Sequence, residues 1–557
     1  MLLFRIVFVV LLTGLAGVVD RIFAGHWPNL LCVSVVLLLT LFVSFALTWY
    51  LGNASRGVAL RKVVVVGDVG DSLPDPPAAM PNAQKWYIES TSPKQGLPHS
   101  CSFVEFDERG DYLDFHQHKH AYGKVLALAK ENEHLIVVMF LHGWRNNGQS
   151  GNVVDFNEFL HQLATNTDVN GPHHRVHGIY LSWRGACLKH AIDPSGETFR
   201  QVAQRYGGDI VDLGQAARFP TLNERLETFS YFDRKSVPEH LSSGTSLSRT
   251  IMTCAHVAKR FRSRCHVFLI GHSFGGLMLE RTFQNATIGE LIMAWPFSQE
   301  VSSEDVKANP LPFDTVLLVN SAAPSIYAKQ FQSLLAGHGH AMFRYKVVGA
   351  NSPVFFSLTS SGDWATGKIH RLANTFCFLL PTLRRKHRGD DFILASAAGS
   401  KDVLIPQSYY YRHTPGHNPL LVNRFIEESK IPASDVPVAP ISQLRANLLN
   451  SGKTLAFGTS PRNGEPAKQW RINFPPDTDA FKDFSQYKTG SQTYLPVVWE
   501  QKAGVYAYKD TAYWIIRCTK EIIKDHNDIW SQQAIDTYVA LYIISLALRE
   551  QKPDGAS

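Results

Sequence analysis

Val267-Phe-Leu-Ile-Gly271-His-Ser273-Phe-Gly275-Gly-Leu277 is the stretch that decides the fold of this chain. An apolar β-run, a glycine-rich turn and a helix-compatible run follow one another, and the turn fits the pattern G-x-S-x-G. In this pattern the serine sits in a strained backbone conformation that lifts its hydroxyl above the sheet edge. Neighbouring turns pass so close that only residues without a Cβ fit at Gly271 and Gly275. We therefore predict a buried strand, a sharp turn carrying Ser273, and a helix whose N-terminal amides face the serine.

Length and composition are those of a large globular protein. The chain has 557 residues, of which 45% are hydrophobic and 11% aromatic, enough for a large core even if some of the length forms insertions. Its net charge of +7 is spread along the sequence and does not suggest nucleic-acid binding. The seven cysteines are scattered, odd in number and without metal-ligand spacing. They indicate a reducing compartment with buried thiols.

The N-terminal region, residues 1–58, is predicted to anchor the protein in a membrane. Leu30–Leu51 is a run of 22 residues without a charge, with Trp27 and Trp49 at its ends, and this length and pattern are typical of a transmembrane helix. The shorter apolar run Ile6–Val19 predicts a second span and hence a helical hairpin. The alternative is that this first run is the apolar core of a cleaved signal peptide.

Positive charges near these segments predict their orientation. Arg5 precedes the first apolar run, and Arg56, Arg61 and Lys62 follow the second, whereas only Arg21 lies in the intervening turn. Because cytoplasmic flanks are enriched in Lys and Arg, both ends of the hairpin are expected to face the cytoplasm. The rest of the chain, residues 59–557, is expected to form one domain on the cytoplasmic side of the membrane.

Apolar and β-branched runs predict eight strands in this domain, and two long intervals are predicted to be insertions. Residues 184–246 are polar and irregular in period, and residues 365–510 separate the last two predicted strands. A helix is expected over 247–262, and an amphipathic final helix from Ser531. The predicted strands are 62–67, 102–106, 135–141, 178–183, 266–270, 314–320, 353–359 and 513–519.

A second turn is predicted to complete the site around Ser273. The apolar strand Leu135–Leu141 runs directly into His142-Gly143, an arrangement typical of the second half of an oxyanion hole, in which glycine permits close approach. We predict that the backbone amides of Trp144 and Phe274 donate to the oxyanion. The alternative for His142-Gly143 is a plain turn at the end of a strand.

An acid and a histidine follow the serine along the chain. Asp363 lies on the loop after a buried strand, and His526 lies between the last predicted strand and the last helix. The resulting order, Ser273, Asp363, His526, is that of a nucleophile, an acid and a base. His413 and His417 are the rival candidates for the base.

Four motifs together look like the α/β-hydrolase superfamily, with closest likeness to lipase- or esterase-like members. This resemblance, over roughly residues 60–550, implies an α/β fold with an eight-stranded, mostly parallel sheet and helices on both faces. It also implies a Ser-His-Asp triad and no cofactor. The roles carried over are Ser273 as nucleophile, His526 as base and Asp363 as acid. The motifs are His142-Gly-Trp-Arg-Asn-Asn147, Gly271-His-Ser-Phe-Gly-Gly276, Ser361-Gly-Asp-Trp364 and Asp525-His-Asn-Asp528.

The expected function is that of a membrane-anchored serine hydrolase that cleaves carboxylic esters, with lipid-like esters as substrates. The apolar stretch 376–383 beside the basic run 384–388 is expected to be a buried edge beside a solvated charge run, and docking on an anionic membrane surface is the alternative. An amidase or peptidase of the same fold, or a catalytically silent binding protein, remains an alternative. The histidines of 116–120 lack companion ligands, so we expect a helix start and no metal site.

Overall fold

The structure of the protein is a computed structural model. It describes residues 87–90, 99–131, 134–144, 146, 151–165, 175–183, 185, 231–261, 265–284, 313–332, 353–371, 374, 392–395, 403–418, 421–428, 454–458, 469–473 and 513–549. The predicted hairpin in residues 1–58, the predicted strand 62–67 and the apolar–basic stretch 376–388 lie outside these ranges. Among the helices that are described, none is both long and apolar enough to cross a bilayer.

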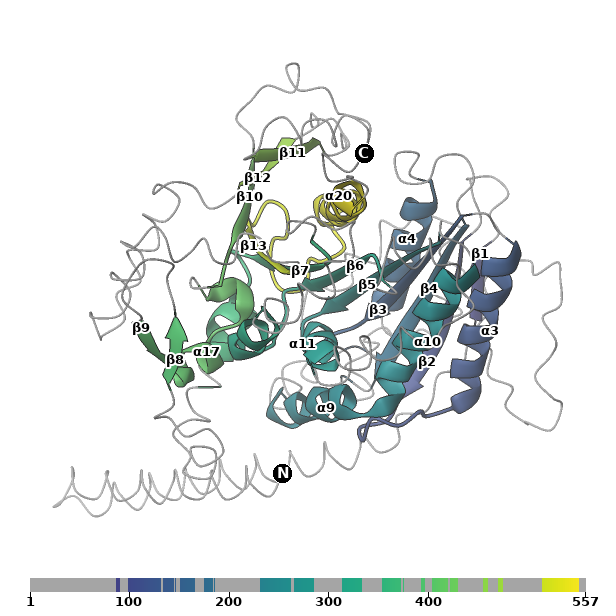
Figure 1. The fold of residues 1–557 in the computed structure, drawn as a ribbon, viewed down its shortest axis with the longest axis horizontal. Helices are drawn as coiled ribbons and strands as arrows, with labels where there is room; N and C mark the ends of the chain where they lie inside the picture. The colour runs from purple at the N-terminus through teal and green to yellow at the C-terminus, as the bar shows by residue number, and fades with distance from the viewer. Residues whose placement is uncertain are drawn as a thin grey trace, which may run out of the picture.

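A large sheet runs through the described part of the molecule (Figure 1). Its strand order is β1-β2-β4-β3-β5-β6-β7-β13-β10-β12-β11, and β8 pairs with β9 in a separate ribbon. All neighbours from β2 to β10 are parallel, which gives eight parallel strands, whereas β1, β12 and β11 are joined antiparallel at the two edges. The strands are β1 Tyr87–Ser90, β2 His99–Phe106, β3 Leu135–Leu141, β4 Arg175–Trp183, β5 Cys265–His272, β6 Thr315–Val319, β7 Phe355–Ser360, β8 Phe392–Ala395, β9 Val403–Pro406, β10 Arg424–Glu428, β11 Thr454–Gly458, β12 Gln469–Asn473 and β13 Tyr513–Cys518.

Helices cover both faces of this sheet. They are α3 Phe115–Glu131, α4 Gly151–Thr165, α9 Tyr231–Ser243, α10 Thr245–Phe261, α11 Phe274–Thr282, the π-helix η8 Ala365–Ile369, α17 Gln407–Arg412, the 3₁₀ helix η9 Pro415–His417 and α20 Gln532–Arg549. One apolar cluster joins the sheet to α3, α9, α10 and α11, and a second joins it to α4 and α20. The protein therefore has an α/β fold of three layers, as the sequence predicted.

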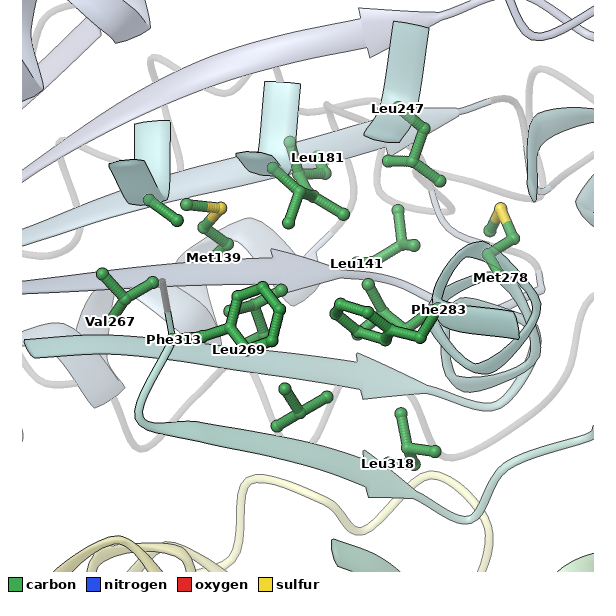
Figure 2. Close-up of a cluster of buried hydrophobic side chains, with 14 of the residues drawn as sticks. Met139, Leu141, Leu181, Leu247, Val267, Leu269, Met278, Phe283, Phe313 and Leu318 are labelled. Atoms are coloured by element: carbon green, nitrogen blue, oxygen red, sulfur yellow. The ribbon is translucent and has the colours of Figure 1, made fainter. Parts of the chain in front are cut away.

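The side chains of β3 alternate between the two apolar clusters, so this strand packs against the helices on both faces of the sheet. Met139 and Leu141 belong to the first cluster, which also contains Leu247 of α10 and Met278 of α11 (Figure 2). Phe140, between them in the sequence, belongs to the second cluster. Because successive side chains of a strand point to opposite faces, a strand buried on both faces has a continuous apolar sequence.

Seven of the predicted strands are described, and each lies in the parallel part of the sheet, as β2, β3, β4, β5, β6, β7 and β13. The eighth parallel strand is β10, which pairs with β13. No strand was predicted there, since β10 belongs to the interval 365–510 that was interpreted as an insertion. Part of this interval thus extends the central sheet.

The end of the other predicted insertion, residues 184–246, is helical. Residues 231–243 form α9, despite Pro238 within the helix, and α10 already begins at Thr245. Helix α9 packs against α11, the helix that follows Ser273. The segment is therefore part of the layer that supports the serine turn.

Candidate active site

Ser273 occupies the turn between β5 and α11, at the carboxyl edge of the parallel strands. Its backbone has φ 55° and ψ −115°, a conformation that L-residues other than glycine rarely adopt. The Ser273 amide donates to the carbonyl of Val319 at 3.0 Å, and the Ser273 carbonyl accepts from the amide of Ala322 at 3.0 Å. Both bonds tie the turn to the end of β6, so the neighbouring strand maintains the strained conformation that the sequence predicted.

Three glycines allow the surrounding backbone to pass close to this turn. A Cβ added to Gly275 would lie 1.9 Å from the carbonyl oxygen of Leu141, and one added to Gly271 would lie 2.8 Å from that of Gly275. A Cβ on Gly143 would lie 2.7 Å from the Cβ of Ser273. These separations are far below a normal contact, so a larger residue would displace backbone. The close approach predicted for Gly271, Gly275 and Gly143 is present.

The structure brings Ser273, His526 and Asp363 into one hydrogen-bonded chain. The Ser273 Oγ lies 2.8 Å from the Nε2 of His526, and the His526 Nδ1 lies 3.1 Å from both carboxylate oxygens of Asp363. If Nδ1–H donates to the carboxylate, Nε2 is left to accept from the serine hydroxyl. Ser273 is 4% exposed and the His526 side chain 18%, so a small part of the site is open to solvent.

Asp363 is held as a buried anion at the beginning of η8. Its carboxylate accepts from the amide of Thr366 at 3.0 Å and also from the Thr366 hydroxyl. Burial by itself raises the pKa of this carboxyl, but the charge and hydrogen bond of His526, with His417 and Thr366, hold the pKa well below its ordinary value. Asp363 can therefore orient the imidazole and stabilise its cation at neutral pH.

The pKa of His526 is shifted upward, opposite to that of Asp363. Burial lowers its pKa, but the charge and hydrogen bond of Asp363, together with the charge of Asp525, outweigh burial and raise the pKa above the ordinary value of 6.5. A more basic imidazole is a better acceptor for the serine proton, provided that the pH is high enough to leave it neutral.

His142 fixes the turn that faces Ser273. Its Nδ1 donates to the carbonyl of Gly143 at 2.9 Å, and its Nε2 accepts from the amide of Trp183 at 3.1 Å. Burial lowers the pKa of His142 to about 4, so the ring is neutral. Since the C=O and N–H of a trans peptide point in opposite directions, the Trp144 amide points away from the Gly143 carbonyl and its His142 donor. The oxyanion roles of the Trp144 and Phe274 amides remain predictions.

The rival histidines lie elsewhere in the hydrogen-bond network. His413 Nδ1 donates to the carbonyl of Tyr409 at 2.8 Å, and His417 Nδ1 lies 3.0 Å from the hydroxyl of Thr414. Burial lowers the pKa of each to about 4. His417 contributes to the field around Asp363, whereas His526 is the histidine hydrogen-bonded to Ser273.

Two residues near the triad were missed by the sequence reasoning. Asn320 directly follows β6 and donates to the carbonyls of Asp525 and His526, at 3.2 Å each. His272, quoted only as the variable position of the elbow, lies with its Nε2 2.8 Å from the carbonyl of His526. A polar residue at the carboxyl end of a parallel strand was a signal for Asn320.

The histidines of 116–120 belong to α3, and His118 is buried there near Thr250, so the segment is less solvated than expected. Across the residues that the structure describes, no cluster of three or more His, Cys, Asp or Glu is arranged to hold a metal ion. Comparisons of the chain with protein-family models, with curated proteins and with solved structures each gave no match.

Proposed function

We propose that this protein is a membrane-anchored serine hydrolase of the α/β-hydrolase fold that cleaves carboxylic esters. The observation that carries the proposal is the chain from Ser273 Oγ through His526 to Asp363, with separations of 2.8 and 3.1 Å, built on a serine in a strained turn. A binding protein has no need of such a strained serine. The parallel sheet and the order serine, acid, histidine support the fold assignment.

In the proposed reaction, His526 Nε2 accepts the proton of Ser273 as Oγ attacks the ester carbonyl carbon. The carbonyl oxygen becomes an anion that the amides of Trp144 and Phe274 stabilise, each by about 2.7–4 kcal/mol if they act like measured oxyanion donors. The C–O bond to the alcohol then breaks, and His526 returns the proton to the departing alkoxide. Asp363 holds the imidazole and stabilises its cation throughout these steps.

The acyl group is now an ester of Ser273. A water molecule gives a proton to His526 Nε2 and attacks the acyl carbon, and the second tetrahedral intermediate collapses with return of that proton to Ser273 Oγ. The products are a carboxylic acid and an alcohol, and the enzyme is regenerated without a cofactor.

Lipid-like esters are the proposed substrates because of the N-terminal sequence. The apolar runs Ile6–Val19 and Leu30–Leu51 would hold the domain at a bilayer, with the basic stretch 384–388 available for anionic lipid headgroups. The domain is proposed to face the cytoplasm, in agreement with the charges that flank these runs.

A fluorophosphonate probe tests the nucleophile in isolated membranes. Wild-type protein is expected to be labelled, and Ser273→Ala to lose labelling. Ser361→Ala is the matched control, because the Ser361 side chain is exposed on the loop that carries Asp363. The hydrogen bond that the backbone amide of Ser361 donates to the Cys518 carbonyl is unaffected by the change. Absence of labelling in folded wild type would support a silent binding protein.

A substrate panel then tests the class of ester. We expect hydrolysis of phospholipid, acylglycerol or thioester substrates presented in vesicles. Cleavage of short soluble esters alone would remove the lipid proposal and leave a general esterase, and cleavage of amide substrates alone would identify an amidase or peptidase of the same fold.

A further inference from the structure

We propose that Asn320 and His272 are positioning residues that hold the backbone of His526 where its imidazole bridges Ser273 and Asp363. The inference rests on the proposed function, since it assigns a role in the same reaction. Neither residue is proposed to touch the substrate. Both act on one atom, the carbonyl oxygen of His526.

Asn320 connects three chain segments through a buried side chain. Its Nδ2 donates to the carbonyls of Asp525 and His526, at 3.2 Å each. Its Oδ1 accepts from the amide of Ser360 at 3.0 Å, and its own amide donates to the carbonyl of Leu358 at 2.8 Å. A single side chain thus joins the end of β6 to the end of β7, which leads to the acid, and to the loop that carries the base.

The backbone of Asn320 is itself unusual. Its φ is 46°, and among the described residues only Ser273 is another non-glycine residue with positive φ. Asparagine adopts this region more readily than most residues, because its short polar side chain can form local hydrogen bonds. Asn320 is fully buried, so its amide needs hydrogen-bond partners. The backbone conformation aims that amide at the histidine loop.

His272 supplies the second donor. Burial lowers its pKa to about 3, with a further lowering by the charge of His526, so the ring is neutral. Because the carbonyl of His526 can only accept, Nε2 must carry the ring proton and donate across the 2.8 Å separation. Its Nδ1 then faces the Gly143 turn, 3.0 Å from where a Cβ of Gly143 would lie. His272 is thus packed between the predicted oxyanion turn and the base.

The histidine loop requires such support because it has no regular secondary structure. Between the end of β13 at Cys518 and the start of α20 at Gln532, the chain consists of turns and bends. Without ladder or helix hydrogen bonds, the position of His526 depends on specific contacts. A displacement of about 1 Å in a catalytic group can reduce the rate about 100-fold.

Asn320→Gly tests the proposal because glycine accepts positive φ without strain, so the variant removes only the side-chain bonds. We expect kcat, or the maximal fluorophosphonate labelling rate, to fall about 10- to 100-fold with KM unchanged. His272→Leu, which lacks the donor, is expected to act in the same direction. His272→Gln, whose amide nitrogen can replace Nε2–H, is expected to restore much of the rate.

The pH at which kcat/KM falls on the acid side of its profile, the acid limb, distinguishes a positioning role of Asn320 from a merely structural one. The titratable groups that face His526 are Asp363, Asp525, His272 and His417. Two of them, Asp363 and Asp525, raise its pKa, and Asp363 has the larger effect. A histidine released from Asp363 loses that stabilisation of its cation, so in Asn320→Gly the limb should move to lower pH. A loss of folded protein would lower the plateau without moving the limb.

Asn423→Ala is the matched control. Asn423 also bonds buried backbone, accepting from the Ile515 amide and donating to the Tyr513 carbonyl, but does so at the other end of β13. The acid limb of the kcat/KM profile of Asn423→Ala should lie at the same pH as that of the wild-type protein. A wild-type kcat together with an unmoved acid limb in Asn320→Gly would overturn the inference. So would a fall in kcat that disappears when the rate is divided by the fraction of active sites that the fluorophosphonate probe labels. Failure of wild type to be labelled would instead refute the proposed function.

Discussion

A different local effect prepares each residue of the proposed triad. The serine is strained at φ 55°, the aspartate is held ionised by its neighbours, and the histidine has a raised pKa because the charges of Asp363 and Asp525 outweigh burial. These effects are opposite in sign for the acid and the base. Such a separation of pKa values is what allows two titratable groups in contact to take different roles at one pH.

The pH dependence expected of the proposed activity follows from the raised pKa of His526. The base acts only when neutral, so kcat/KM should rise with pH through a midpoint above 6.5. Asp363→Asn removes the charge that stabilises the imidazolium, so the midpoint should move to lower pH while kcat falls about 10⁴-fold, as in other serine triads.

The comparison variant for this pH profile is Asp525→Asn. Asp525 is exposed, and solvent weakens charge interactions there. In Asp525→Asn the midpoint of the kcat/KM profile should therefore move much less than in Asp363→Asn, and kcat should be nearly retained. Profiles of ester hydrolysis between pH 5 and 9 measure both. A wild-type midpoint below 6.5 would contradict the proposed role of the Asp363–His526 pair.

At the scale of elements, the acid loop after β7 and the histidine loop after β13 fit together as one unit. The Ser360 hydroxyl donates to the carbonyl of Ile523, and the Ser361 amide donates to the carbonyl of Cys518 at 2.8 Å. A Cβ on Gly362 would lie only 2.2 Å from the carbonyl oxygen of Lys524. The glycine lets the two loops touch immediately before Asp363 and His526.

Gly362→Ala is therefore expected to push the histidine loop away from the acid loop. Because the contact is with backbone, relief requires movement of the loop, and the labelling rate should fall at least 10-fold with only a small decrease in Tm. Ser361→Ala, one residue earlier and exposed, is the control for the loop. Wild-type labelling by Gly362→Ala would show that the close contact does not position the base.

At the scale of the whole molecule, Asp314 links all three layers at the edge of the sheet opposite the site. Its carboxylate accepts from the Val267 amide of β5 at 2.7 Å and pairs with Lys259 of α10 at 2.6 Å. Its carbonyl accepts from the Ser545 hydroxyl of α20 at 2.8 Å. Helices α10 and α20 lie on opposite faces, so this residue ties the sheet to both helical layers.

Asp314→Ala should destabilise the protein without changing its chemistry. Removing one partner of a buried ion pair costs about 3 kcal/mol, enough to lower Tm by several degrees, whereas kcat measured well below Tm should be retained. Glu131→Ala, at the exposed end of α3, is the control. An unchanged Tm, or a lower kcat at unchanged stability, would contradict this assignment.

Features that depend on local chemistry could be predicted from the amino-acid sequence. Apolar runs gave seven strands of the parallel sheet, because a strand buried on both faces leaves a continuous hydrophobic pattern. The turn at Ser273 was predictable because close backbone approach admits only glycine at Gly271 and Gly275. The place of His526 between the last predicted strand and the last helix favoured it over His413 and His417, and the structure hydrogen-bonds His526 to both Ser273 and Asp363.

The contacts between distant segments could not be predicted in this way, because they depend on how the strands pair in the folded protein. Asp363 and His526 are 163 residues apart, and their contact depends on β7 and β13 being neighbours in the sheet. Strand β10 joins that sheet from an interval with no clear strand pattern, because its place depends on pairing with β13. The position of Asn320 at the end of a strand marks it as a candidate site residue, but its contact with the His526 carbonyl, like that of His272, is hidden in the sequence, since a backbone acceptor leaves no mark on the residue types around it. Local rules specify elements and turns, but the hydrogen bonds that hold His526, the proposed base, arise only when the carboxyl ends of several strands are packed side by side.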